Sequence, residues 1–225
     1  MQNFYIQIKN AIDESITNIE FFKKKQDSSM VTKNDILVQK KIKQIIKKNF
    51  PDVKQFICEE NFKKKTFNKV NFKKPFAIID PIDGTENFFA EDYMFGSLIS
   101  VSSKKKGDVD LIYIPKLRKI ITRDNIKKLC RKPKTNNNIS ILSTKCLGKK
   151  KYKGSNFRIY GSSAFSFFQL ITGKANQYVY CDGAKIWDCF TGLRLLKLTE
   201  CNLENRVNNW ILKPSFKIRF SAKWF

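Results

Sequence analysis

The sequence predicts one layered domain of the α+β or α/β class, from its length, its composition and its alternating patterns. A chain of 225 residues suffices for a large domain that buries about 70 to 75% of its unfolded surface. Hydrophobic residues make up 42% of the chain and aromatic residues 13%, which excludes intrinsic disorder. Helical periodicities are interleaved with short apolar runs, which favours sheets and helices layered in one fold. We expect a single domain over residues 1–225, with an N-terminal α+β half at about 1–123 and a C-terminal α/β half at about 136–225.

Two amphipathic helices are predicted to open the chain, over residues 3–24 and 35–48. The second ends before Pro51, because the residue that precedes a proline disfavours helical geometry. The apolar stripe of the first helix, at spacings of three and four, consists of Phe4, Ile8, Ile12, Ile16 and Ile19. Runs rich in Ile and Phe then predict strands at 55–58, 76–79, 95–101, 109–114 and 119–122.

Residues 124–138 have little periodicity and contain Pro133 and three consecutive asparagines, so we expect a surface connection there. After it, helices are predicted over 162–172, closed by Gly173, and over 186–198. The remaining apolar runs predict strands at 139–143, 157–160, 177–180 and 217–220.

The charge of the chain is strongly positive, at 44 Lys and Arg against 20 Asp and Glu, or +24. The lysines are scattered in short runs and no nucleic-acid module is visible, so we favour a basic surface that attracts phosphorylated small molecules. Nucleic-acid binding stays open as an alternative. No apolar run reaches the roughly 18 residues that cross a bilayer, and the N-terminus lacks a secretory pattern, so we expect a cytoplasmic protein without membrane contact.

The six cysteines form no C-x-x-C pair, and the chain contains no histidine, which excludes a Cys/His zinc site. In a cytoplasmic protein we expect all six to be reduced thiols.

Residues 77–88 carry the strongest chemical signal. An apolar strand ends in Asp80, Pro81 restricts the backbone, and Asp83 follows three residues later. Two carboxylates at the end of a buried strand suit hard cations, which take oxygen ligands. If Gly84 and Thr85 begin a helix, their backbone N–H groups form an anion site for phosphate. The alternative is an ordinary turn capped by two carboxylates.

The string Asp80-Pro-Ile-Asp-Gly-Thr-Glu-Asn-Phe88 resembles the D-P-[IL]-D-G-T-x-N-F signature of the inositol monophosphatase superfamily. Further similar segments occur in the family's order and approximate spacing, over roughly residues 3–225. They are Val31-Thr-Lys-Asn-Asp35, the Glu59-Glu60 pair, Gly161-Ser-Ser-Ala164 and Trp187-Asp188. The resemblance implies a layered αβαβα sandwich of the inositol monophosphatase and sugar phosphatase type.

The resemblance also implies a set of metal ligands for two or three Mg²⁺ ions. Glu59, Asp80 and the carbonyl of Ile82 are expected to hold the first ion, and Asp80, Asp83 and Asp188 the second. The physical reason does not depend on the family, because four crowded carboxylates repel one another unless divalent cations neutralise them.

By the same resemblance, a metal-activated water attacks the phosphorus, oriented by Thr85 Oγ and Glu59, and Asp83 completes the catalytic group. Asp35 and Glu60 are expected to contact the metal ligands and orient them without binding the metal themselves. The predicted substrate contacts are Gly84, Thr85, Ser162, Ala164 and Asp182.

The implied activity is a phosphomonoesterase that acts on inositol 1-phosphate or a related polyol or sugar phosphate. The alternatives are a 3'(2'),5'-bisphosphate nucleotidase, a sugar bisphosphatase, and a basic relative that binds nucleic acid or a partner with little catalysis. The family often forms dimers, so a homodimer is compatible with the resemblance. Cys181 stands seven residues before Asp188, where relatives that hydrolyse inositol phosphates usually carry Glu. Neighbouring Asp182 is the expected substitute, if the loop shifts.

Overall fold

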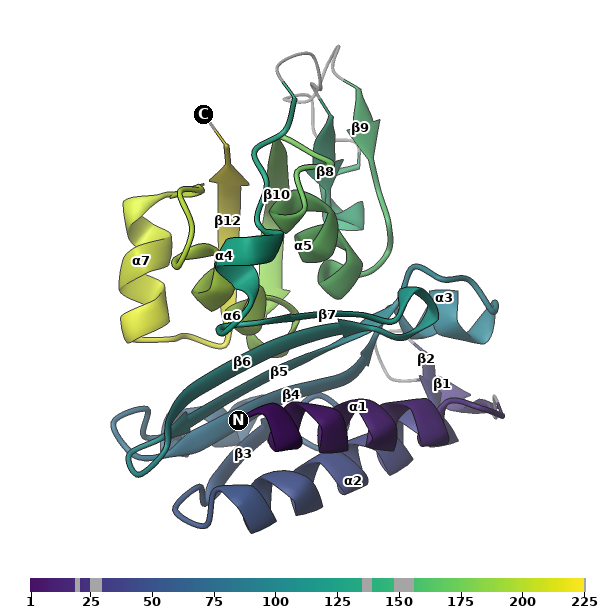
Figure 1. Cartoon of the computed structure of the whole chain (residues 1–225), viewed down its shortest axis with the longest axis vertical. Coiled ribbons are helices and arrows are strands. Elements are labelled where there is room, and N and C mark those ends of the chain that lie inside the picture. Colours follow the sequence, from purple (N-terminus) through teal and green to yellow (C-terminus); the bar gives the residue numbers. More distant parts are fainter. Residues whose placement is uncertain (19–20, 25–29, 135–138, 148–155, 225) are drawn as a thin grey trace.

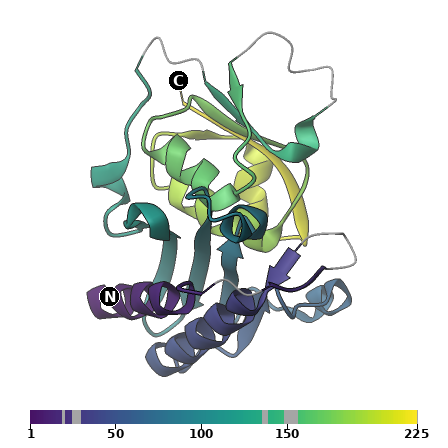
Figure 2. The same ribbon diagram turned by 90° about the vertical axis from the view of Figure 1, so that its right-hand side faces the viewer.

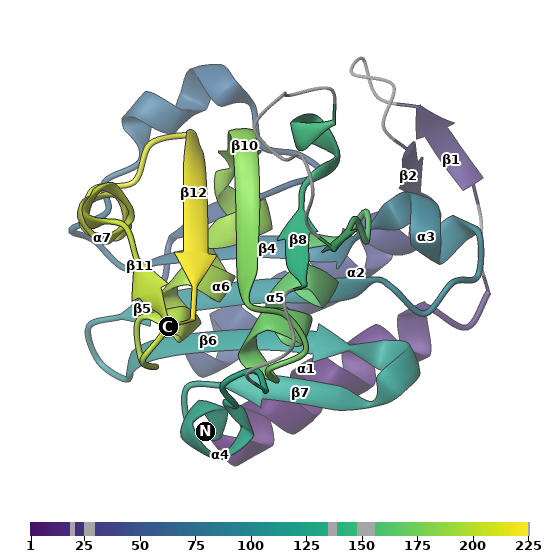
Figure 3. The same cartoon turned by 90° about the horizontal axis from the view of Figure 1, so that it is seen from above.

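The structure, a computed structural model, describes residues 1–18, 21–24, 30–134, 139–147 and 156–224. Two five-stranded sheets lie on either side of helices α5 (Ser163–Ile171) and α6 (Ile186–Leu196). The strands of one sheet run crosswise to those of the other (Figures 1 and 3). An outer helix pair, a sheet, the central helices and the second sheet follow one another in Figure 1, as the predicted layered fold requires.

The first sheet is covered on its outer face by α1 (Gln2–Ser15) and α2 (Lys33–Asn49), at the opposite end of the molecule from the C-terminus (Figure 2). Its β3 and β4 are parallel and its other neighbours antiparallel. The strand order is β3 (Gln55–Cys58), β4 (Phe76–Asp83), β5 (Gly96–Ser103), β6 (Gly107–Ile114) and β7 (Lys119–Thr122).

Alternation along β4 explains why this sheet is buried on both faces. Ala77 and Ile79 pack toward α1 and α2, whereas Phe76 and Ile78 belong to the core around α5 and α6. The two central helices approach closely at Gly192, where a Cβ atom would clash with the Phe167 ring.

The predicted first helix is too long. It ends at Ser15, and residues Phe21–Lys24 form strand β1, which pairs with β2 (Met30–Thr32). The side-chain amide of Asn34 donates hydrogen bonds to the carbonyl oxygens of Ser15 and Asn18, at 2.6 and 2.7 Å. This contact from the start of α2 satisfies carbonyls at the helix end, so the helix stops there. Ile19, predicted on the same stripe, lies outside the described residues.

The second sheet pairs β10 in parallel with β8, which is parallel to β9, and in antiparallel fashion with β12, the partner of β11. Helix α7 (Asn205–Leu212), which the sequence did not predict, packs on β12 and α6 through Val207 and Trp210. The strand order is β11 (Asn202–Leu203), β12 (Lys217–Lys223), β10 (Gln177–Lys185), β8 (Ser140–Leu142) and β9 (Phe157–Arg158).

The expected surface connection at 124–138 is partly wrong, because it contains the short helix α4 (Ile126–Leu129), whose Ile126 is buried. Its residues 135–138 lie outside the described part of the chain. No helix among the described residues combines the length and the apolar character that crossing a bilayer requires.

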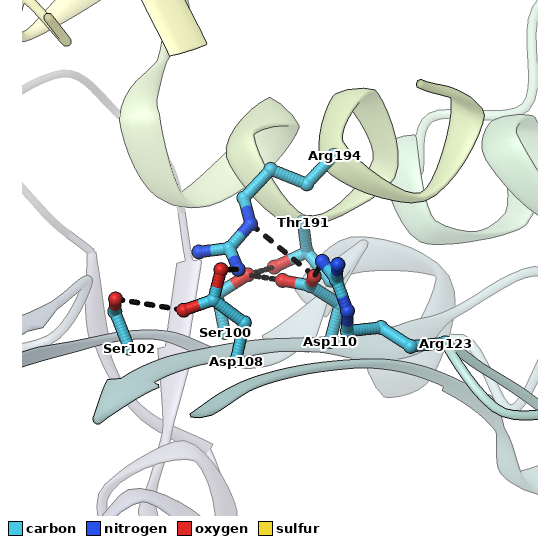
Figure 4. A network of polar contacts seen from close by, with 7 residues as sticks. All are labelled: Ser100, Ser102, Asp108, Asp110, Arg123, Thr191 and Arg194. Carbon is cyan, nitrogen blue, oxygen red and sulfur yellow. Dashed lines mark hydrogen bonds and ion pairs between the residues drawn. The ribbon is translucent and has the colours of Figure 1, made fainter. Parts of the chain in front are cut away.

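A polar network fastens α6 to the first sheet (Figure 4). The fully buried Asp110 lies 3.2 Å from Arg194 Nε and 2.8 Å from Arg123 Nη1. Its other oxygen accepts a hydrogen bond from Ser100 Oγ at 2.5 Å, and Ser100 Oγ lies 2.9 Å from Thr191 Oγ1. The network is completed by a 2.7 Å ion pair of Arg194 with Asp108.

Candidate active site

An irregularity in β4 brings two aspartates to one side of the strand. Asp80 pairs with Leu98 and Asp83 with Gly96, so three steps along β4 match two steps along β5. In a regular strand, residues three apart point to opposite faces. The extra residue acts as a bulge and reverses that alternation, so both carboxylates face the same site.

Four acidic residues from three elements meet there. Carboxylate oxygens of Asp80, Asp83 and Asp188 lie within 4.8 Å of one another. Glu59 follows β3, and its backbone N–H donates to the carbonyl of Ile79 at 3.1 Å, which extends the pairing of β3 with β4. These four residues line one cavity of about 160 Å³, together with Ile82, Gly84 and Thr85. The structure therefore brings all five predicted metal ligands together.

Burial and mutual repulsion disfavour the charged forms of these acids. Burial first, and then the charge of Glu59, raise the pKa of Asp188 from 3.8 to about 8. Burial raises the pKa of Asp83 to about 7, against the lowering effect of its hydrogen bonds to Ser162 and Ala164. The pKa of Asp80 lies well above its ordinary value, because of burial and its acidic neighbours.

A hard divalent cation fits this group of residues. Asp80 Oδ1 is buried and has no hydrogen-bond partner among the described residues. An orphaned carboxylate oxygen within a cluster of acids is unfavourable in a folded protein, and coordination by a cation would relieve it. The available donors are all oxygen atoms, which suits Mg²⁺ or Ca²⁺.

The N-terminus of α5 holds Asp83 in place. Ser162 Oγ and the backbone N–H of Ala164 each donate to Asp83 Oδ2 at 2.6 Å. Ser162 Oγ also accepts a hydrogen bond from the N–H of Phe165 and so caps the helix. Both residues are predicted substrate contacts, and in the structure both contact the predicted metal ligand Asp83. Ser162 also lines a second cavity.

The N-terminus of α2 positions Thr85 through a buried carboxylate. Thr32 and Asp35 form a capping box, in which the Thr32 N–H donates to Asp35 Oδ2 at 2.6 Å. The other carboxylate oxygen of Asp35 lies 3.2 Å from Thr85 Oγ1, and the carbonyl oxygen of Ile82 lies 3.0 Å from the same hydroxyl. Asp35 thus positions the Thr85 hydroxyl by direct contact.

A second cavity of about 120 Å³ adjoins the acidic group and shares Asp83 and Asp188 with it. Its wall is rich in hydroxyl groups and contains no Lys or Arg among the described residues. Sequence reasoning missed this wall, because its members lie on separate segments that only the fold brings together. They include Ser143, Thr144, Ser163, Tyr178 and Tyr180.

Two predicted site residues are not brought to either cavity. Asp182 has a side chain 58% exposed and lies 3.7 Å from Arg219 Nη2. Glu60 follows Glu59 in sequence, and its backbone N–H donates to Gln39 Oε1 at 3.2 Å. Neither lines the cavities that contain the acidic group.

The expectation of six reduced thiols is wrong for one pair. Cys146 and Cys181 form a disulfide, with Cα atoms 5.2 Å apart. The other four cysteines are free thiols. The pairing arises because β8 and β10 are neighbours in register, with Leu142 opposite Val179, so the segments that follow them emerge side by side.

Comparison with known proteins agrees with this architecture. The model of the inositol monophosphatase family matches residues 4–198. An inositol monophosphatase/NADP phosphatase solved with Mg²⁺ and phosphate superposes with a TM-score of 0.77 and 17% identity, over 99% of this chain and 88% of that one. The suhB protein of Bartonella henselae superposes with a TM-score of 0.73 and 18% identity, over 99% of this chain and 93% of that one. An inositol monophosphatase of Thermotoga maritima superposes with a TM-score of 0.71 and 19% identity, over 99% of this chain and 92% of that one.

A curated relative matches over a shorter stretch. The 3'(2'),5'-bisphosphate nucleotidase CysQ of Haemophilus influenzae is 31% identical over 91 residues, which are 40% of this chain and 33% of that protein. The match thus spans only a third of that relative. The family match, by contrast, covers most of the chain and includes all four clustered acids. The chain belongs to the inositol monophosphatase family.

Proposed function

We propose that this chain is a Mg²⁺-dependent phosphomonoesterase that hydrolyses the monophosphate of a small polyol or sugar, with inositol 1-phosphate as the first candidate. Phosphoric monoester hydrolysis is the activity of its family. The observation that carries the proposal is the cluster of Glu59, Asp80, Asp83 and Asp188 around one cavity. A cytoplasmic location, as expected above, is part of the proposal, and a homodimer is compatible with it.

The acidic residues are suited to hold the metal. Glu59, Asp80 and the carbonyl of Ile82 would form one set of ligands, and Asp80, Asp83 and Asp188 another. When bound, Mg²⁺ supplies Lewis-acid chemistry, because it activates water and stabilises negative charge on phosphate oxygens.

Thr85 would orient the attacking water. When its hydroxyl donates to Asp35 Oδ1, at 3.2 Å, the lone pairs of Thr85 Oγ1 are left to accept a hydrogen bond from water. Asp35 is fully buried and anchored by Thr32, so the direction of that acceptor is fixed. Glu59 would accept the second hydrogen bond of the same water. Gly84 and Thr85 would present backbone N–H groups to the phosphate.

The hydroxyl-lined cavity supports a polyol as the leaving group. Serine, threonine and tyrosine hydroxyls both donate and accept hydrogen bonds, which matches the hydroxyl groups of a polyol or sugar. A second phosphate group would favour Lys or Arg in this wall, and the described lining residues include neither. The similarity to CysQ keeps a bisphosphate nucleotidase as the second candidate.

Phosphate release by the purified protein tests the proposal, with inositol 1-phosphate, fructose 1,6-bisphosphate and adenosine 3',5'-bisphosphate as substrates. We expect turnover only with Mg²⁺ and highest kcat/KM on inositol 1-phosphate. Asp80→Asn should abolish it, whereas Glu200→Gln, which neutralises an exposed acid paired with Lys132, should not. Preference for the nucleotide would select the second candidate. Turnover without Mg²⁺, or full activity of Asp80→Asn, would refute the proposal that hydrolysis depends on Mg²⁺ held by the acidic residues.

A further inference from the structure

The Cys146–Cys181 disulfide joins two segments beside the hydroxyl-lined cavity. Thr144, two residues before Cys146, and Tyr180, the residue before Cys181, both line that cavity. Cys146 ends a short 3₁₀ helix at Thr144–Cys146, and Cys181 lies where the pairing of β10 with β12 is irregular, between Tyr180 and Ala184. The covalent bond therefore connects the two segments that carry Thr144 and Tyr180 into the lining of the cavity.

The pairing of β8 with β10 fixes the chain as far as Ser143, whose N–H donates to the carbonyl of Val179 at 3.0 Å. Beyond Ser143, Cys146 packs with Leu142 and Val179 in an apolar cluster separate from the two main cores, and its Sγ lies 3.6 Å from the carbonyl oxygen of Val179. The disulfide adds a covalent link between the Thr144–Cys146 segment and β10.

The other four cysteines are free thiols, and none of them lines the hydroxyl-lined cavity. Cys58, Cys189 and Cys201 are buried, which limits the access of a thiol reagent to them. The disulfide is therefore the described cysteine group that lies beside this cavity.

We propose that the Cys146–Cys181 disulfide is a redox-sensitive modification site that controls binding of the substrate's leaving group. This inference rests on the proposed function, because it assigns regulation to the same site. The oxidised form holds Thr144 beside Tyr180, so that both hydroxyls can contact a polyol. The reduced form releases the Thr144–Cys146 segment, and those contacts weaken.

A cellular dithiol reductant completes the reaction. Its thiolate attacks the sulfur of Cys181, which is partly exposed whereas Cys146 is buried. The sulfur–sulfur bond breaks, Cys146 leaves as a thiolate and takes up a proton, and a mixed disulfide forms at Cys181. The second thiol of the reductant then displaces Cys181, which is also protonated. Two electrons pass to the protein, and the reductant becomes a cyclic disulfide.

The test compares oxidised wild-type protein with the same protein reduced by dithiothreitol, so it needs no substitution. Thiol titration after unfolding should find four thiols in the oxidised chain and six in the reduced one, since four of the six cysteines are free. On reduction we expect the KM for inositol 1-phosphate to rise about tenfold, the effect of losing roughly one hydrogen bond. With p-nitrophenyl phosphate, which has no leaving-group hydroxyls, KM should stay constant.

Variants separate the disulfide from other effects of the reductant. Cys146→Ser and Cys181→Ser should show the high KM for inositol 1-phosphate under oxidising conditions and lose their response to dithiothreitol. Cys130→Ser, which alters a free thiol away from both cavities, should respond like the wild type.

The outcomes distinguish this inference from the proposed function. Mg²⁺-dependent hydrolysis of p-nitrophenyl phosphate, together with a KM for inositol 1-phosphate that is insensitive to reduction, would overturn the redox inference alone. Six titratable thiols in the oxidised protein would also overturn it. Absence of hydrolysis of every substrate would refute the proposed function. The redox inference would then be judged by calorimetric binding of inositol 1-phosphate in both redox states, and equal affinities would overturn it.

Discussion

Replacing Arg194 by methionine should destabilise the protein by about 3 kcal/mol. Removing one member of a buried ion pair typically costs about 3 to 5 kcal/mol, because the other charge stays buried without compensation. Arg194 is 7% exposed and its partner Asp110 is fully buried. Asp110 keeps Arg123 at 2.8 Å and the hydroxyl of Ser100 at 2.5 Å, so we expect the lower end of that range.

Urea denaturation followed by circular dichroism would measure this loss, and calorimetry should show a fall in Tm of about 6 to 12 °C for a chain of this length. Arg206→Met is the matched control, because Arg206 pairs with Glu204 while 58% exposed. Exposed pairs contribute about 0 to 1 kcal/mol. Equal losses for Arg194→Met and Arg206→Met would refute the argument from burial.

The stability loss caused by Arg194→Met should also depend on pH. Burial raises the pKa of Asp110, and Arg194 opposes that effect. Without the guanidinium the pKa rises further, so acidification neutralises Asp110 sooner in Arg194→Met than in the wild type. The stability difference between the two proteins should therefore shrink as the pH falls, and a constant difference would contradict this explanation.

Four further outcomes are expected. Because burial raises the pKa of Asp83 to about 7 and of Asp188 to about 8, from 3.8, the metal-free folded state binds more protons than the unfolded chain, and its Tm should fall as the pH rises from 4 to 8. Asp188→Asn should raise the Tm of the metal-free protein at neutral pH, since folding then no longer requires protonation of this buried acid, and it should abolish the rise in Tm on addition of Mg²⁺. Thr85→Ala should lower kcat about 10²-fold with little change in KM, as measured by phosphate release. Asp182→Asn should leave kcat/KM on inositol 1-phosphate unchanged, because Asp182 lines neither cavity, and a large loss would show that its segment moves to reach the substrate.

Local patterns were sufficient to predict most of the first sheet. Strands 55–58 and 119–122 agree with β3 and β7, because each is a short apolar run bounded by polar residues. The end of the first helix was not predictable, since it depends on an amide from Asn34. Helix α7 was missed because only Val207 and Trp210 mark its buried side.

The candidate metal ligands could be predicted because they lie in short strings with fixed spacing, of which 80–88 is the most specific. The hydroxyl-lined wall and the disulfide could not. Cys146 and Cys181 are 35 residues apart, and only the parallel register of β8 with β10 makes them neighbours. Nothing in the chain around either cysteine indicates which of the other five it would meet.

The bulge in β4 makes the number of residues between Asp80 and Asp83 as important as their identity. Successive side chains on a strand point to opposite faces of the sheet. The extra residue shifts this alternation by one position between the two aspartates. Replacing Ile82 by another apolar residue would leave both carboxylates on the same side, and its carbonyl would remain available. Deleting it would turn one carboxylate away while every acidic residue stayed in the sequence. A variant of this turn can therefore replace Ile82, but it should keep the number of residues between Asp80 and Asp83.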